Sequence, residues 1–191
     1  MWLRQRIEPG TSVLLVGASA YGGGGAGTNN LVERGVASFT RAHALVYGGG
    51  NPQLGCPHSA GDACALPFAD SSFDYVVSNA VIEHVGGPER ARTMLTESRR
   101  VARRGAFHTT PDRWFPVETH TQVPLLHWLP RDRQAAAFAR AGKPTWNTTY
   151  YWLFGSRDLA GLDPAFSVSR INRMTLVTAW TADATTSADL A

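Results

Sequence analysis

Side chains that can move protons are concentrated at two places in the sequence. Glu83 and His84 stand side by side after an apolar run, and His120 lies in a later stretch rich in proline and tryptophan. Carboxylates and imidazoles are the usual general bases in proteins, so these groups are candidates for catalysis. The full set of candidate bases is Glu83, His84, His108, Asp112, Glu118 and His120. The competing interpretation for each is structural, with Glu83 and His84 capping or anchoring a turn.

A second group of polar side chains has the composition of a metal site. Cys56, His58 and Cys64 lie close together in the sequence. A structural zinc site uses four ligands, and no clear fourth ligand accompanies these three. We therefore expect no metal site in this chain. Two cysteines are also too few for a disulfide scaffold.

A glycine-rich segment at 17–27 separates an apolar run at 12–16 from a helix that we expect to begin at Asn30. Asn30 with Glu33 three residues later is close to a capping box. The expected buried stripe of the helix is Leu31, Val32, Val36 and Phe39. A second apolar run follows at 42–47, and the order strand, loop, helix, strand is typical of a βαβ unit. The glycines either let a ligand approach the backbone closely or form a flexible connector.

This unit lacks the residues of nicotinamide chemistry. Dinucleotide binding requires an acidic residue at the end of the second strand, where this chain has Tyr47. A short-chain dehydrogenase needs a tyrosine four residues before a lysine, but Ala139 stands at that spacing before the only lysine, Lys143. The sequence therefore disfavours a nicotinamide-dependent enzyme.

The remaining elements complete an α/β protein. The sequence predicts strands at 73–78, 105–109, 167–171 and 174–180, and helices at 87–102 and 131–141. Together they predict a Rossmann-like three-layer sandwich, whose mostly parallel sheet ends in an antiparallel C-terminal hairpin. We expect a single domain over residues 1–180, with an insertion or lid at 111–141 after the fifth strand, and a flexible tail at 181–191.

The composition is that of an ordinary globular protein. The 191 residues are 43% hydrophobic and carry a formal net charge of +3. Neither a signal peptide nor an apolar run of about 18–20 residues is visible, so we expect a cytoplasmic protein without a transmembrane segment. The densest basic cluster is Arg99, Arg100, Arg103 and Arg104. A solvated helix end explains it more simply than a phosphate-binding patch, and no nucleic-acid partner is expected.

Two segments of the chain resemble one enzyme family. Gly61–Val85, which reads GDACALPFADSSFDYVVSNAVIEHV, resembles class I S-adenosylmethionine-dependent methyltransferases from the third strand through the fourth. It is most similar to the type 11 branch, whose pattern is GDA-x-x-LPF-x-D-x-SFD-x-V followed by EH. Residues 110–130 are similar to an insertion after the fifth strand in some members of that branch. With the order of elements, the resemblance covers about residues 12–180.

The resemblance implies a position for each part of the cofactor, S-adenosylmethionine, which leaves as S-adenosylhomocysteine. Asp62 and Ala63 would hold the adenine. The implied cofactor-binding residues are Gly17, Ala18, Ser19, Tyr47, Asp62, Ala63, Ser78, Asn79 and Ala80. Of the candidate bases, we expect Glu83, His84 and His120 to be catalytic. The acceptor would be an unidentified small molecule or a glycan- or lipid-linked group.

The chain departs from the family at two acidic positions. Leu15 replaces an acid in the first strand, and Tyr47 replaces the acid that ends the second. The short connection from Tyr47 to Gly61 also predicts that the usual intervening helix is absent. The alternative is therefore a degenerate methyltransferase-like domain that binds a partner without catalysis. The aromatic insertion is expected to pack over the sheet and wall the pocket, with contact to a membrane surface as a further interpretation. The oligomeric state is left open.

Overall fold

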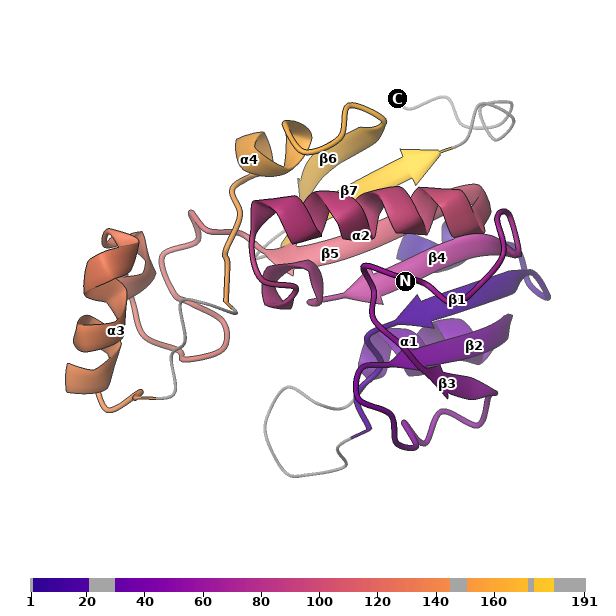
Figure 1. Cartoon of the computed structure of the whole chain (residues 1–191), viewed down its shortest axis with the longest axis horizontal. Coiled ribbons are helices and arrows are strands. Elements are labelled where there is room, and N and C mark those ends of the chain that lie inside the picture. The colour runs from indigo at the N-terminus through magenta and orange to yellow at the C-terminus, as the bar shows by residue number, and fades with distance from the viewer. Residues whose placement is uncertain (1, 21–29, 145–150, 172–173, 181–191) are drawn as a thin grey trace.

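The computed structural model describes residues 2–20, 30–144, 151–171 and 174–180. Its centre is one seven-stranded sheet with the order β3-β2-β1-β4-β5-β7-β6 (Figure 1). The strands are β1 (Ser12–Val16), β2 (Arg41–Val46), β3 (His58–Ala60), β4 (Phe73–Asn79), β5 (Ala102–Pro111), β6 (Phe166–Ile171) and β7 (Met174–Trp180). The first five pair in parallel, which confirms the Rossmann-like α/β fold. β7 pairs antiparallel with both β5 and β6, and the connection between β6 and β7 lies outside the described residues.

The central strands are continuous apolar runs because both faces of the sheet are covered. In β1, Leu14 and Val16 face one core cluster, whereas Val13 and Leu15 face the other. All four side chains are at most 1% exposed. This alternation makes β1 the shared wall of the two cores.

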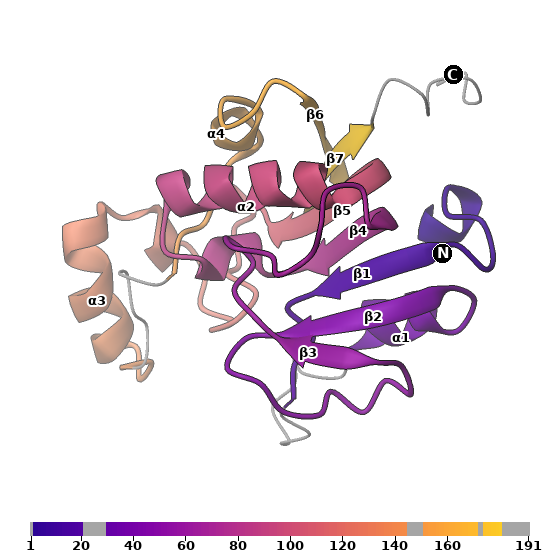
Figure 2. The ribbon, with the colours of Figure 1, turned by 45° about the vertical axis from the view of Figure 1, so that its right-hand side comes forward.

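Helices lie on both faces of the sheet, so the molecule has three layers (Figure 2). The helical elements are η1 (Trp2–Gln5), α1 (Leu31–Ala37), η2 (Ile82–His84), α2 (Pro88–Val101), η3 (Leu126–Trp128), α3 (Arg131–Arg140) and α4 (Ser156–Ala160), where η denotes a 3-10 helix. α2 packs Met94 and Leu95 into one core, and α1 packs Val36 into the other. No helix forms between β2 and β3, as the short connection predicted.

The start of α1 differs from the expected capping box. Asn30 adopts a left-handed φ of 44°, and its side chain makes no capping hydrogen bond. Its amide instead accepts the N–H of Ser19 and donates to the Ser19 carbonyl, both at 2.9 Å. Leu31 is 74% exposed, so its expected burial is wrong. The buried positions of the short helix are Glu33 and Val36, and Asn30 closes the loop that precedes it.

The segment between β5 and β6 leaves the sheet at the end where the parallel strands terminate (Figure 1). It contains η3, α3 and α4 and has its own small cluster, formed by Phe138, Tyr151 and Leu153 with Val123 and Leu126. Pro111 is the last residue of β5 rather than a residue beyond its end. A backbone bridge between Asp112 and Phe154 holds the two ends of the segment together.

The arginine cluster is paired with carboxylates. The pairs are Arg99 with Asp163, Arg100 with Asp70 and Glu97, Arg103 with Asp74, and Arg104 with Glu8, at 2.6–2.8 Å. Only the first two arginines belong to the last turn of α2, and the other two lie in β5. The cluster therefore ties α2 and β5 to neighbouring segments and is more than a solvated helix end.

Asp74 joins the beginnings of β1 and β4. Its Oδ2 accepts the backbone N–H and the hydroxyl of Ser12 at 2.8 and 2.7 Å, and its Oδ1 accepts from Arg103 at 2.7 Å. Burial alone would raise the pKa of Asp74, but these hydrogen bonds and the Arg103 charge lower it overall. The ionised form therefore stabilises the fold.

We expect Asp74→Ala to lower the free energy of unfolding by about 1–3 kcal/mol at neutral pH, because charged hydrogen bonds are lost at a largely buried site. Since the folded pKa lies below the ordinary value of 3.8, this difference should persist above that pH and shrink as the pH falls further. Urea unfolding across the pH range measures it. Asp70→Ala is the matched control, because Asp70 is 77% exposed and its pairing with Arg100 is worth about 0–1 kcal/mol. Equal losses in the two variants would contradict the prediction.

Candidate functional site

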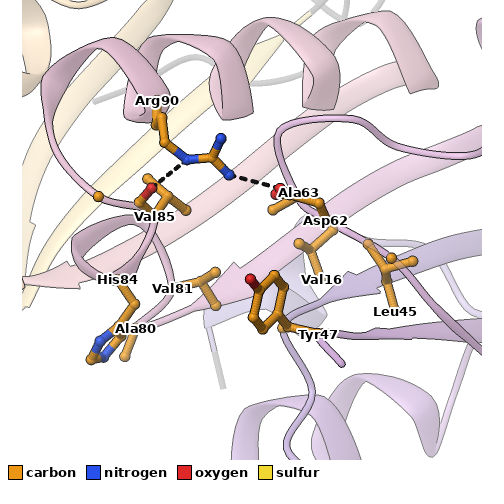
Figure 3. A pocket seen from close by; sticks show the side chains of 13 residues that line it. Val16, Leu45, Tyr47, Asp62, Ala63, Ala80, Val81, His84, Val85 and Arg90 are labelled. Carbon is orange, nitrogen blue, oxygen red and sulfur yellow. Dashed lines mark hydrogen bonds and ion pairs between the residues drawn. The ribbon is translucent and has the colours of Figure 1, made fainter. Parts of the chain in front are cut away.

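A cavity of about 910 Å³ opens where β1, β2 and β4 end (Figure 3). It is lined by Val16, Gly17, Leu45, Tyr47, Gly61, Asp62, Ala63, Ala80, Val81, His84, Val85, Gly86 and Arg90. From β1 the chain adds β2 and then β3 on one side of the sheet, and it then crosses to the other side of β1 to form β4. The cavity therefore lies at the point where the strand order reverses. Open α/β sheets bind ligands at this point.

Gly17 brings the backbone close to the opposite wall of the cavity. Its φ is +79°, and a Cβ at this position would lie 2.4 Å from Cγ2 of Val81. Only glycine fits both the left-handed conformation and the available space. The first strand therefore ends in bare backbone at the cavity.

Asp62 and Arg90 form the charged side of the cavity (Figure 3). Arg90 donates to Asp62 Oδ2 at 2.7 Å and to the Val85 carbonyl at 2.6 Å, while Asp62 Oδ1 accepts the Cys64 N–H at 2.9 Å. The Cys64 hydrogen bond is the main cause that lowers the pKa of Asp62, with a further contribution from Arg90. The Asp62 side chain is 37% exposed, so it is held in place but still accessible.

Arg90 was not identified from the sequence, although one signal was present. It is the third residue of α2, and a cation in the first turn opposes the helix dipole. An arginine at such a position indicates a nearby carboxylate, which the fold supplies as Asp62.

The three residues expected to be catalytic converge beside this cavity. Glu83 and His84 lie in η2 just after β4, and His120 comes from the segment after β5. Glu83 Oε1 is 3.9 Å from Nε2 of His84 and 3.9 Å from Nε2 of His120. His84 also lines the cavity, so the cluster borders it directly. Below, these three residues are called the Glu–His–His cluster.

Glu83 is completely buried in this cluster. Its Oε2 accepts the Thr110 hydroxyl at 2.9 Å, whereas its Oε1 has no hydrogen-bond partner among the described residues. Burial raises the pKa of Glu83 to about 7. Burial, with a smaller contribution from His120, lowers the pKa of His84 to about 4.

His120 is fixed by Glu118. Glu118 Oε1 lies 2.9 Å from His120 Nδ1 and also accepts the His120 backbone N–H at 2.9 Å. Burial would raise the pKa of Glu118, but hydrogen bonds from His120 and Thr121 lower it to about 2. The Tyr151 hydroxyl donates to Glu118 at 3.2 Å, and the Tyr151 ring packs edge-on against His84 and His120.

The comparisons with known proteins match part of this chain to a family model. The model of the type 11 methyltransferase domain matches residues 23–109, just under half of the chain. The chain carries a methyltransferase domain. It is of the S-adenosylmethionine-dependent kind, as the sequence resemblance implied. A search of curated proteins found no significant match.

Solved methyltransferases share the fold of this domain. An S-adenosylmethionine-dependent methyltransferase from Methanosarcina mazei matches with a TM-score of 0.58 and 15% identity, over 93% of this chain and 94% of its own. Magnesium protoporphyrin IX methyltransferase from Synechocystis, solved with bound S-adenosylhomocysteine, matches at 0.53 and 14%, over 91% and 75%. Phosphoethanolamine N-methyltransferase 2 from Haemonchus contortus, in complex with S-adenosylmethionine, matches at 0.57 and 14%, over 88% and 37%.

The cavity contains five of the nine residues expected to bind the cofactor, namely Gly17, Tyr47, Asp62, Ala63 and Ala80. The other four lie outside its lining. Ala18 is in the core, and Ser19 is bound through its backbone to Asn30. The Ser78 hydroxyl lies 2.7 Å from His108 Nδ1, and Asn79 accepts the Thr109 hydroxyl. At the two positions that depart from the family, Leu15 is buried in the core, while Tyr47 is 79% exposed at the cavity.

The remaining candidate groups have other partners. His108 is fully buried, which lowers its pKa to about 3, and Asp112 forms an ion pair with Arg170. Among the described residues, the Glu–His–His cluster is the one group whose side chains come within reach of a single metal ion, so Cys56, His58 and Cys64 do not form such a group. In the described part of the chain, no helix has the length and apolar character to cross a membrane.

We expect Gly17→Ala to destabilise the domain more than Gly10→Ala. Both glycines have φ near +78°, but a Cβ at Gly10 would meet nothing within 4 Å. Both alanine variants should therefore suffer backbone strain of about 1–3 kcal/mol, and Gly17→Ala should in addition be destabilised by the steric clash with Val81. Chemical unfolding measures both variants. A double-mutant cycle with Val81→Ala should give a coupling above about 0.5 kcal/mol, and its absence would show that the backbone relaxes away from Val81.

Proposed function

We propose that the cavity binds S-adenosylmethionine and that the Glu–His–His cluster holds the acceptor, a small molecule or a glycan- or lipid-linked group. The observation that carries this proposal is that His84 belongs to both the cavity lining and the cluster. Donor and acceptor would therefore meet at the end of β4. Such proximity is the main requirement for methyl transfer.

In this proposal each wall of the cavity has a separate task. Asp62 accepts the exocyclic amine of adenine, and the Ala63 N–H binds the ring. Tyr47 presents its hydroxyl to the ribose in place of the acid at the end of β2, and Gly17 lies beneath the methionine part. The fit is supported by the bare backbone at Gly17 and by the carboxylate of Asp62, which Arg90 and Cys64 hold in position.

The bound cofactor supplies a methyl group on a positively charged sulfur. The protein then has to bring the nucleophilic atom of the acceptor into line with that methyl group, activate it and exclude water. Glu83, His84 and His120 orient and activate that atom. Glu118 and Thr110 act as positioning residues, since they reach the acceptor only through His120 and Glu83.

The segment at 111–141 encloses the acceptor side in this proposal, within a single domain at 1–180. The segment contributes His120 to the cluster, and its apolar side chains Val123 and Leu126 pack with Phe138 over Tyr151. Three large apolar side chains of the segment stay exposed: Trp114 at 56%, Leu125 at 49% and Trp128 at 40%. These exposed side chains suit an acceptor with apolar parts. The expected tail at 181–191 lies outside the described residues.

Calorimetric titration with S-adenosylhomocysteine, the unreactive product, tests the donor site. We expect micromolar or tighter binding by the unmodified protein. Asp62→Ala should weaken binding by about ten-fold or more, because a charged hydrogen bond is worth about 1.5–3 kcal/mol. Asp70→Ala is the matched control, as Asp70 is an exposed, arginine-paired aspartate outside the cavity.

An unchanged dissociation constant in a folded Asp62→Ala variant would remove Asp62 from the donor site. Absence of binding by the unmodified protein up to millimolar ligand would overturn the proposal and favour the degenerate binding domain. His120→Ala separates the two sites, because His120 does not line the cavity and its loss should leave this affinity unchanged.

A further inference from the structure

We propose that Glu83, His84 and His120 bind one divalent cation of the zinc type through Glu83 Oε1 and the Nε2 atoms of both histidines. The metal site itself is defined by this chain's side chains alone. Its role in activating the acceptor rests on the proposed function. The sequence led us to expect no metal, because Cys56, His58 and Cys64 lack a clear fourth ligand, and it gave no sign of this site, whose ligands lie in two separate segments.

The spacing of the ligand atoms matches a single ion. Oε1 of Glu83 lies 3.9 Å from each histidine Nε2, and the ligand atoms of the cluster all lie within 4.8 Å of one another. Zinc bonds to nitrogen and oxygen are about 2.0–2.2 Å long, so ligands at tetrahedral angles lie roughly 3.4 Å apart. The two 3.9 Å separations exceed this spacing by about half an ångström and the largest separation, up to 4.8 Å, by about 1.4 Å, so rotation of the two partly exposed histidine side chains would have to draw the ligands together around a metal.

The buried carboxylate oxygen needs a partner that the described protein atoms do not provide. Glu83 is 0% exposed, and Oε1 lacks any hydrogen bond in the described structure while Oε2 is bound by Thr110. Leaving a carboxylate oxygen buried and unpaired is costly. The equal distances to the two histidines are too long for hydrogen bonds, so neither imidazole takes this role. A cation between the three groups would contact all of them.

The outer contacts of the cluster are those that orient metal ligands. His120 Nδ1 lies 2.9 Å from Glu118, so a proton on Nδ1 is donated outward and the Nε2 lone pair faces the cluster. A carboxylate behind a histidine in this way is the usual support of a metal-bound imidazole. Glu118 is itself held by the N–H groups of His120 and Thr121 and by the Tyr151 hydroxyl. The Thr110 hydroxyl gives Glu83 the equivalent support.

Three protein ligands leave a fourth position open, as in catalytic rather than structural zinc sites. Because His84 lines the cavity, we infer that this position is available to the acceptor. The metal ion would lower the pKa of a bound hydroxyl or thiol of the acceptor, and that group would then lose its proton to water. The resulting oxygen or sulfur anion would attack the methyl carbon. The new carbon–oxygen or carbon–sulfur bond forms as the carbon–sulfonium bond breaks, and the electron pair stays on the cofactor sulfur.

Zinc binding tests the proposal directly. Protein without a histidine tag is stripped with a chelator and titrated with zinc against a chromophoric competing chelator. We expect one site per chain in the unmodified protein. His120→Ala and Glu83→Gln should each weaken zinc binding by about a hundred-fold or more, and Glu118→Gln by about 10–100-fold. His58→Ala is the matched control, because His58 is an exposed histidine on β3 outside the cluster.

Circular dichroism and S-adenosylhomocysteine titration of the same variants separate the alternatives. Loss of zinc affinity in folded variants that still bind S-adenosylhomocysteine supports the metal site. Failure of the unmodified protein to bind zinc below millimolar concentration, or equal affinity in His120→Ala and His58→Ala, would overturn it. If the unmodified protein binds S-adenosylhomocysteine but not zinc, only the metal site is overturned. If it binds zinc but not S-adenosylhomocysteine, only the donor site is overturned.

Discussion

The parallel pairing of β1 with β4 is the constraint on which the site depends. Its register places Val16 opposite Ser78, so both strands end at the same level. The chain must then turn away from the sheet at Gly17 and at Ala80, which both have positive φ. The gap between these diverging connections is the cavity. Its walls are therefore a consequence of backbone hydrogen bonding in the sheet, and side chains only refine its shape.

Buried charge is the second theme of the structure, and it is handled differently on the two sides of the cavity. In the cavity lining, Asp62 has an arginine and a backbone N–H as partners and stays partly exposed. At the neighbouring Glu–His–His cluster, both oxygens of Glu118 accept hydrogen bonds, whereas one oxygen of Glu83 accepts none among the described residues. The described part of the fold gives Glu118 its hydrogen-bond donors but leaves Oε1 of Glu83 without one, which costs some stability. That oxygen is therefore free to bind a ligand.

The sequence predicted the layers well because apolar periodicity reports burial directly. The continuous apolar run of β1 and the helical pattern at 87–102 were sufficient to predict these two elements, since both patterns are local in sequence. The glycine at the end of β1 left two alternatives open, a close backbone approach or a flexible connector, and the structure shows the close approach at Gly17. The prediction that Leu31 is buried was wrong, because α1 is too short for its apolar pattern to define which face is buried. Tertiary contacts bury Glu33 instead.

The candidate site was predictable only in parts. The motif around Asp62 and the pair Glu83–His84 are contiguous in sequence, but their partners Arg90 and His120 arrive through the path of the chain. That path is determined by long-range contacts such as the N–H of Trp152 on the Glu83 carbonyl and the bridge from Asp112 to Phe154, which leave no periodic trace. Sequence reasoning therefore identified the groups but not their common centre.

The position of His120 has a consequence for how such a protein can diversify. The family match ends at residue 109, and His120, Glu118 and Tyr151 all come from the chain beyond it. In the proposed function, the residues that face the cofactor lie between Gly17 and Arg90, whereas those that complete the acceptor side follow later in the sequence. If the proposed function holds, insertions, deletions or recombination after β5 would change the acceptor side and leave the residues of the donor cavity intact. A lineage can in this way acquire new substrates without having to rebuild its use of the methyl donor.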